Sequence, residues 1–185
     1  MKGSKSSAGP GRASGFTLIE LMIALAIVGI LLMVAVPSFR EAMMNVRISA
    51  QTNDLLTDLS VARSEAVKRN LPVLLCTSTN GQSCGGRWSD GWIVFVDADN
   101  SASVTDGDLV VKTRPAAEGN NSIVATAGTE TLSAVSYRPT GLTGNKALVK
   151  FSICDSRTAT ASGREIEITV TGRAKSTRVQ CATAP

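Results

Sequence analysis

An uninterrupted apolar block near the N-terminus constrains this chain more than any other feature. Residues 21–36 contain no polar side chain. At 1.5 Å per residue, a helix of this length covers roughly 24 Å, somewhat less than the bilayer hydrocarbon thickness of about 30 Å. Including Phe16–Ile19 makes up the difference and places Glu20 in or near the membrane. An ionisable group there costs about 2–3 kcal/mol on insertion scales and usually has a partner.

The residues around this block leave three interpretations. Residues 1–15 are basic, small and polar, which is typical of a leader. A conventional signal peptide would be cleaved after the apolar block, but here the chain continues from Pro37 into a helical pattern. A plain signal anchor is the second interpretation, and a leader that is cleaved before the block is the third.

The third interpretation rests on the motif Gly15-Phe16-Thr17-Leu18-Ile19-Glu20-Leu21, followed by the apolar run and Pro37. This motif resembles the type III signal of the type IV pilin family. The resemblance implies that a prepilin peptidase cleaves after Gly15 on the cytoplasmic side and that the new amine of Phe16 is methylated. It also implies an assembly role for Glu20.

The charges fit this resemblance independently. Lys2, Lys5 and Arg12 favour a cytoplasmic leader and leave the C-terminal domain outside the membrane. Glu20 gains a partner if it faces the Phe16 ammonium of a neighbouring subunit. Such a pair favours the correct axial register between subunits more than it adds to stability. The alternative is that Glu20 reaches the membrane interface with its side chain.

The rest of the chain predicts an α+β fold. Residues 38–69 have helical periodicity, with charged residues such as Asp58 and Arg63 between the apolar ones, and Asn70 and Pro72 end the pattern. Period-two segments follow, with turns that include Gly163. The expected strands are 73–77, 92–97, 109–114, 122–126, 134–138, 148–154, 165–171 and 178–181.

We therefore expect a long N-terminal helix packed on a C-terminal antiparallel β domain, as in pilins. Its first half would span the membrane and its second half would be amphipathic. The expected parts are the leader 1–15, the transmembrane or filament-core helix 16–37, the amphipathic helix 38–71 and the β-rich periplasmic domain 72–185.

The four cysteines all lie in the sheet region, and an exported domain favours disulfides. Four cysteines allow three pairings. We favour Cys76–Cys84, across the Asn80-Gly81 turn, and Cys154–Cys181, which ties the last strand to an earlier one. Metal binding is the alternative, but the spacings are not those of a zinc site.

An enzyme is not expected, because the chain has no histidine and no Ser-His or Cys-His pair can form. No cofactor is expected either. Five Asp and Asn residues, Asp97, Asp99, Asn100, Asp106 and Asp108, raise calcium as an alternative to a solvated, turn-rich hairpin. Their spacing is not that of an EF-hand loop.

The region around this loop resembles a subfamily of pilins. The segment Gly91–Asp97, the loop, and the end of the chain from Cys154 through Gly172-Arg173 to Cys181 are similar to minor pilins of the FimT and FimU kind and to the H-type minor pseudopilin of type II secretion. The resemblance implies a minor pilin that takes part in pilus assembly, at or near the tip, from the bacterial inner membrane. Its partners would be other minor pilins, the major pilin and the inner-membrane assembly platform.

An H-type minor pseudopilin of a type II secretion system is one alternative function, and a DNA-binding tip pilin for DNA uptake is another. FimT-like pilins carry a Gly-Arg-x-Arg motif, which Gly172-Arg173-Ala174-Lys175 resembles with a lysine in place of the second arginine. We expect Arg173 and Lys175 to share a face, with further positive charge from the candidates Arg178, Lys146 and Lys150. Residues 138–185 carry eight basic and three acidic side chains, whereas residues 70–137 carry three and seven. A solvated hairpin that balances the acidic middle is the other interpretation.

Overall fold

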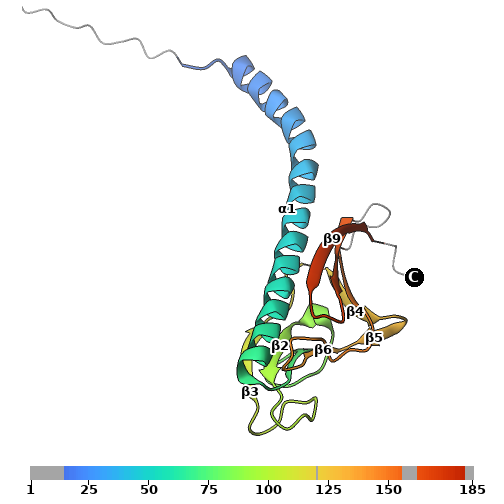
Figure 1. Ribbon diagram of the computed structural model, residues 1–185. Coiled ribbons are helices and arrows are strands. Elements are labelled where there is room, and N and C mark those ends of the chain that lie inside the picture. Colours follow the sequence, from blue (N-terminus) through green and yellow to red (C-terminus); the bar gives the residue numbers. More distant parts are fainter. Residues whose placement is uncertain (1–14, 120, 156–161, 182–185) are drawn as a thin grey trace, which may run out of the picture. The chain divides into compact units, whose positions relative to one another are not determined.

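The protein is described by a computed structural model that covers residues 15–119, 121–155 and 162–181 (Figure 1). The predicted leader therefore lies outside the described residues, except Gly15. The chain divides into two compact units, Met1–Glu41 and Ala42–Pro185. One helix, α1 (Leu18–Arg69), belongs to both, and it continues through Pro37 without interruption.

The second unit contains the amphipathic part of α1. The buried side chains on it recur every three or four residues, as one face of a helix requires. They are Ile48, Gln51, Thr52, Leu55, Asp58, Leu59, Ala62 and Ala66. The helix ends as the sequence predicts, because Asn70 takes a left-handed conformation with φ of 55° and Pro72 follows.

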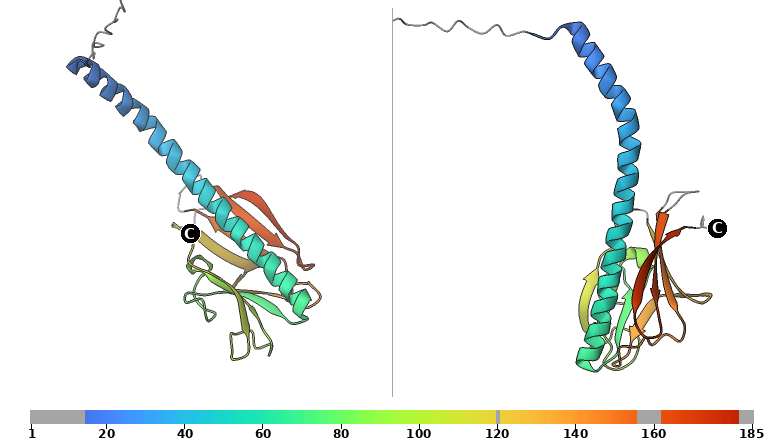
Figure 2. Two further views of the ribbon diagram at one scale, coloured as in Figure 1. Left: turned by 90° about the vertical axis from the view of Figure 1, so that its left-hand side faces the viewer. Right: turned by 45° about the horizontal axis from the view of Figure 1, so that its top comes forward.

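Two antiparallel sheets make up the rest of this unit (Figures 1 and 2). The first has the strand order β3-β2-β1-β6 and the second β5-β4-β7-β8-β9. The elements are β1 (Val73–Thr77), the short 3-10 helix η1 (Trp88–Asp90), β2 (Trp92–Val96), β3 (Leu109–Arg114), β4 (Ser122–Ala127), β5 (Glu130–Leu132), β6 (Ala134–Tyr137), β7 (Val149–Cys154), β8 (Ser162–Ile168) and β9 (Ala174–Gln180).

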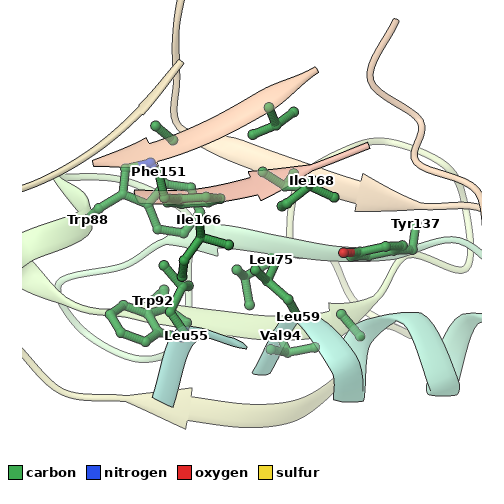
Figure 3. Close-up of a cluster of buried hydrophobic side chains, with 14 of the residues drawn as sticks. Leu55, Leu59, Leu75, Trp88, Trp92, Val94, Tyr137, Phe151, Ile166 and Ile168 are labelled. Atoms are coloured by element: carbon green, nitrogen blue, oxygen red, sulfur yellow. The ribbon is translucent and has the colours of Figure 1, made fainter. Parts of the chain in front are cut away.

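The main core lies between α1 and the inner faces of both sheets (Figure 3). Leu55 and Leu59 from the helix, Leu75 from β1 and Ile166 from β8 are fully buried there. Trp88 and Phe151 pack edge to face in the same core, with ring centroids 4.8 Å apart. The α+β prediction is confirmed, because one helix covers antiparallel sheets.

The strands β1 and β2 are buried on both faces. Their inner side chains belong to the main core, and the outer ones form a second cluster of Leu74, Cys76, Ile93 and Phe95. Val104, from the acidic loop after β2, packs on this second cluster. The loop therefore covers hydrophobic surface as well as connecting two strands.

The strand predictions are wrong at the C-terminal end. Gly163, expected in a turn, lies inside β8, and the chain turns instead near Gly172, whose φ is 80°. Strand β9 begins four residues before the expected Arg178, and β5 was not expected. The start of β9 is polar because it is an edge strand with one neighbour, so it lacks the alternation that marks a half-buried strand.

Candidate assembly and interaction sites

The predicted processing site lies directly before the helix. Gly15 and Phe16 precede α1, and the Phe16 side chain is 84% exposed. The hydroxyl of Thr17 accepts a hydrogen bond from the backbone N–H of Glu20 at 3.3 Å, which makes Thr17 the N-cap of α1. Sequence reasoning missed this cap, although Thr17-x-x-Glu20 is the pattern of a capping box.

The first unit presents apolar side chains on every face. The large ones from Leu18 to Val36 are exposed, and α1 is the one helix of the described residues that is long and apolar enough to cross a membrane. None of its most apolar window is buried by the chain itself. Such a surface is stable in lipid or against other apolar helices.

The carboxylate of Glu20 stands in the first turn of this apolar segment. Among the described residues no side chain forms an ion pair or a hydrogen bond with this carboxylate, and the hydroxyl of Thr17 contacts only the backbone N–H of Glu20. The predicted partner, the Phe16 amine, would come from another subunit, and this pairing stays a prediction.

A buried ionic cluster fixes α1 to the first sheet. Asp58 is fully buried and accepts hydrogen bonds from Trp92 Nε1 and Arg114 Nε, each at 2.9 Å. Lys112 also pairs with Asp58, and Arg114 reaches Asp54 at 3.0 Å. The hydrogen bond to Asp58 raises the pKa of Arg114.

Asp58 lies on the buried face of α1, although the sequence pattern predicts it among the charged residues between the apolar ones. The helical spacing indicates that Asp58 is buried, because Asp58 is three residues from Leu55 and next to Leu59, on the buried face. The partners that make this burial tolerable come from β2 and β3.

Arg63 ties two turns to the helix. Its Nε donates to the carbonyl of Gly141 and its Nη2 to the carbonyl of Thr171, each at 3.0 Å. The turns meet at Gly172, where a Cβ would collide with the carbonyl oxygen of Gly141. Arg63 therefore helps to hold the β8–β9 turn that carries Arg173.

The cysteines pair as the sequence analysis favours. Cys76 and Cys84 form one disulfide, with Cα atoms 5.6 Å apart, and Cys154 and Cys181 form the other, with Cα atoms 5.9 Å apart. The second bridge passes over β8, because Cys154 pairs in register with Gly163. A Cβ on Gly163 would collide with the Sγ of Cys181 and with the carbonyl oxygen of Ile153, which explains glycine inside this strand.

The candidate DNA-binding residues do not form one patch on the second sheet. Lys150, Glu167 and Lys175 lie in register on three adjacent strands, so they share one face. Lys150 Nζ lies 3.0 Å from both Glu165 and Glu167. The hydrogen bond that Lys150 donates to Glu165 is the main reason why the pKa of Lys150 is raised. Its charge is therefore already compensated.

The other candidates lie elsewhere. Arg178 is three residues from Lys175 on the same strand, so its side chain is on the opposite face of the sheet. Our expectation that Arg178 joins Lys175 is wrong for this reason. Arg173 is exposed beside the β8–β9 turn, and Lys146 is exposed in the segment before β7. DNA binding stays a prediction, and the positive charges that would support it are less concentrated than the sequence suggests.

The acidic loop is organised by its own backbone. Asp97 is buried and accepts hydrogen bonds from the backbone N–H groups of Ser101 and Ala102. Asp108 accepts from the N–H groups of Ala98 and Thr105. Carboxylate oxygens of Asp97, Asp99 and Asp108 lie within 4.8 Å of one another. These residues have a structural role in the loop, and calcium binding there stays a prediction.

Comparison with known proteins decides the family. Residues 51–173, about two thirds of the chain, match the family model described as type II transport protein GspH. The chain belongs to this family. Residues 11–36 of this GspH-family protein also match the prokaryotic N-terminal methylation motif. That motif and the apolar helix fit a pilin that is anchored in the inner membrane.

Solved structures show the same fold. The GspH-family chain resembles the type IV minor pilin FimU of Pseudomonas aeruginosa with 18% identity and a TM-score of 0.57, over 71% of this chain and 89% of FimU. A second crystal form of FimU gives 18% identity and a TM-score of 0.54, over 70% and 91% of the two chains. The chain therefore shares the fold of FimU.

Proposed function

We propose that this protein is a minor pilin that takes part in assembling a type IV pilus, at or near the filament tip. The observation that carries this proposal is the N-terminal part of α1, whose apolar side chains are exposed on all faces. One carboxylate, that of Glu20, lies in its first turn. A membrane covers such a segment before assembly, and the equivalent helices of other subunits cover it afterwards.

In this proposal a prepilin peptidase cleaves after Gly15 and the amine of Phe16 is methylated. The C-terminal unit faces the periplasm, where both disulfides form in an oxidising environment. Glu20 then meets the Phe16 ammonium of a neighbouring subunit inside the apolar bundle. The pair sets the axial register of the incoming subunit, because a shifted subunit would leave both charges unpaired in a low-dielectric environment.

The proposed partners are other minor pilins, the major pilin and the inner-membrane assembly platform. The similarity of fold to a type IV minor pilin supports a minor role, and the match to the N-terminal methylation motif supports the prepilin pathway. The role requires no catalytic group, which agrees with a chain that lacks histidine.

The Glu20→Ala variant tests this proposal. It should insert in the inner membrane and fold outside it, because the change removes an insertion cost of about 2–3 kcal/mol. It should be lost from the sheared filament fraction on an immunoblot. Glu41→Ala is the matched control, because Glu41 lies on the same helix beyond the apolar segment. Normal incorporation of Glu20→Ala would show that the charge pair is not needed.

A deletion strain tests the choice of filament. We expect the number of surface pili to fall and to be restored by the wild-type chain supplied in trans. Normal piliation with a defect in protein secretion would assign the protein to a type II secretion filament instead.

A further inference from the structure

A groove of about 730 Å³ lies between α1 and the β8–β9 hairpin, within the second unit. Figures 1 and 2 show β9 running beside the helix. The helix contributes residues between Asn45 and Asn53, and the hairpin contributes Arg164, Arg178 and their neighbours. Part of the wall is apolar, and Val46 is 60% exposed there.

The two arginines occupy one end of a row across the inner face of the second sheet. In register from β4 to β9, this row reads Ile123, Ile153, Arg164 and Arg178. The isoleucines are buried in the core. The row therefore changes from apolar to basic where the sheet reaches the groove.

This pairing of arginines is unfavourable for the fold. Like charges directly opposite each other on neighbouring strands destabilise a sheet. Arg164 donates a hydrogen bond from Nη2 to Ser49 Oγ at 3.3 Å, and the side chain of Arg178 has no ion pair or hydrogen bond within the described part of the chain. None of the described residues lining the groove is acidic. An anionic group from outside would remove the repulsion.

The composition of the walls indicates what kind of molecule carries this anion. Apolar side chains such as Val46, Ala50 and Val179 line the groove beside the arginines. These apolar side chains make no favourable contact with the phosphate groups of a nucleic acid. No aromatic side chain is present among the described lining residues to stack on a base. A peptide that presents a carboxylate next to an apolar side chain matches both the arginines and the apolar wall of the groove. Its carboxylate can be bound by the guanidinium groups in a bidentate manner, and its apolar side chain can pack against the wall.

We propose that this groove binds an acidic, partly apolar segment of a neighbouring filament subunit, with its carboxylate held between Arg164 and Arg178. The proposal rests on the proposed function, because neighbouring subunits meet through their N-terminal helices. The helix wall of the groove begins nine residues after Val36, so it is close along the chain to the segment that brings subunits together.

A photoreactive amino acid at position 46 tests the proposal in the full-length chain, in cells that make the filament. We expect cross-links to a peptide of another filament subunit, with Asp or Glu within a few residues of the attached position, identified by mass spectrometry. Arg178→Gln should lower the cross-linking yield about tenfold, which corresponds to the loss of one ion pair at the rim of an interface.

Lys175→Gln is the matched control, because Lys175 lies on the same strand but on the opposite face of the sheet. It should leave the cross-link unchanged. Arg178→Glu should also abolish the cross-link, and an acidic-to-arginine change in the captured peptide should restore it. This restoration distinguishes an ion pair from general damage to the hairpin.

Three results would overturn the proposal. The first is that a chain that reaches the membrane gives no cross-link, and the second is that the captured peptide has no acidic residue. The third is that Arg178→Gln and Arg164→Gln leave the cross-linking yield unchanged. Salt-dependent binding of duplex DNA that is weakened by Arg178→Gln but not by Lys175→Gln would assign the groove to nucleic acid. A strain that needs the protein for secretion rather than piliation would contradict the proposed function, while a charge-dependent cross-link to a secretion-filament subunit would still support the groove.

Discussion

The indole N–H of Trp92 donates a hydrogen bond of 2.9 Å to the carboxylate of Asp58, in a place where the two residues are 3% and 0% exposed. This contact joins a helix to a sheet through side chains 34 positions apart. Two cations on β3 complete the cluster, so the helix is held over this sheet by charge and hydrogen bonding as well as by apolar packing.

Asp58→Ala should lower the free energy of unfolding by about 3 kcal/mol, because it leaves Lys112 and the indole N–H of Trp92 without their acceptor and takes from Arg114 its buried carboxylate partner. Denaturation of the detergent-solubilised chain, followed by tryptophan fluorescence, measures this, since both tryptophans lie in the second unit. Asp54→Ala is the control. Its side chain is 47% exposed, so the cost should stay below about 1 kcal/mol. Equal losses would contradict a special role for the buried cluster.

Gly163→Ala should prevent closure of the Cys154–Cys181 disulfide, because the new Cβ collides with the Sγ of Cys181 and with the carbonyl oxygen of Ile153. The bridge closes a loop with a sequence separation of 27, so its loss should cost about 3.5 kcal/mol on the loop-entropy model. Thiol titration of the purified chain should detect two free cysteines. Ser162→Ala, the neighbouring change in β8, should leave none, and an intact bridge in Gly163→Ala would refute the steric argument.

Alkaline conditions should destabilise the second unit through Tyr137. Burial raises the pKa of Tyr137 to about 12, against the attraction of Arg63, which lowers it. Since an unfolded tyrosine has a pKa of about 10, the stabilisation is fully present below that pH and is lost as the pH rises through about 12. The whole effect amounts to about 3 kcal/mol.

The chain has one tyrosine, so the ultraviolet absorbance of tyrosinate reports this group alone. We expect the absorbance to appear together with unfolding, about two pH units above the titration of a free tyrosine. Tyr137→Phe should remove this contribution to the alkaline loss of stability. Titration near pH 10 in the folded chain would contradict the predicted burial effect.

The mature N-terminus should be Phe16, methylated on its amine, when the protein is made in cells with a prepilin peptidase. Intact-mass measurement of the membrane fraction checks this. Gly15→Val should block cleavage, because a branched side chain obstructs the site. A mature chain that starts after Val36 instead would be the product of a conventional signal peptidase and would refute the prepilin interpretation.

The sequence alone determined the features that depend on neighbours along the chain. The motif from Gly15 to Leu21, the apolar block and the end of the helix at Asn70 are local, so periodicity and composition suffice to recognise them. The bounds of β1 and β3 were predicted to the residue because their apolar runs are bounded by turn signals. The two disulfide pairings follow from the expected turn at Asn80-Gly81 and from the expected link between the last strand and an earlier one.

Only the tertiary structure decided which side chains meet across elements. Asp58 is buried because β2 and β3 bring donors to it. Strand β8 has a glycine at position 163 because a disulfide passes over it, and Arg164 faces Arg178 because the register of β8 and β9 aligns them. A shift of one residue in that register would move each side chain to the other face of the sheet. Register depends on contacts throughout the core, which no local pattern in the sequence contains.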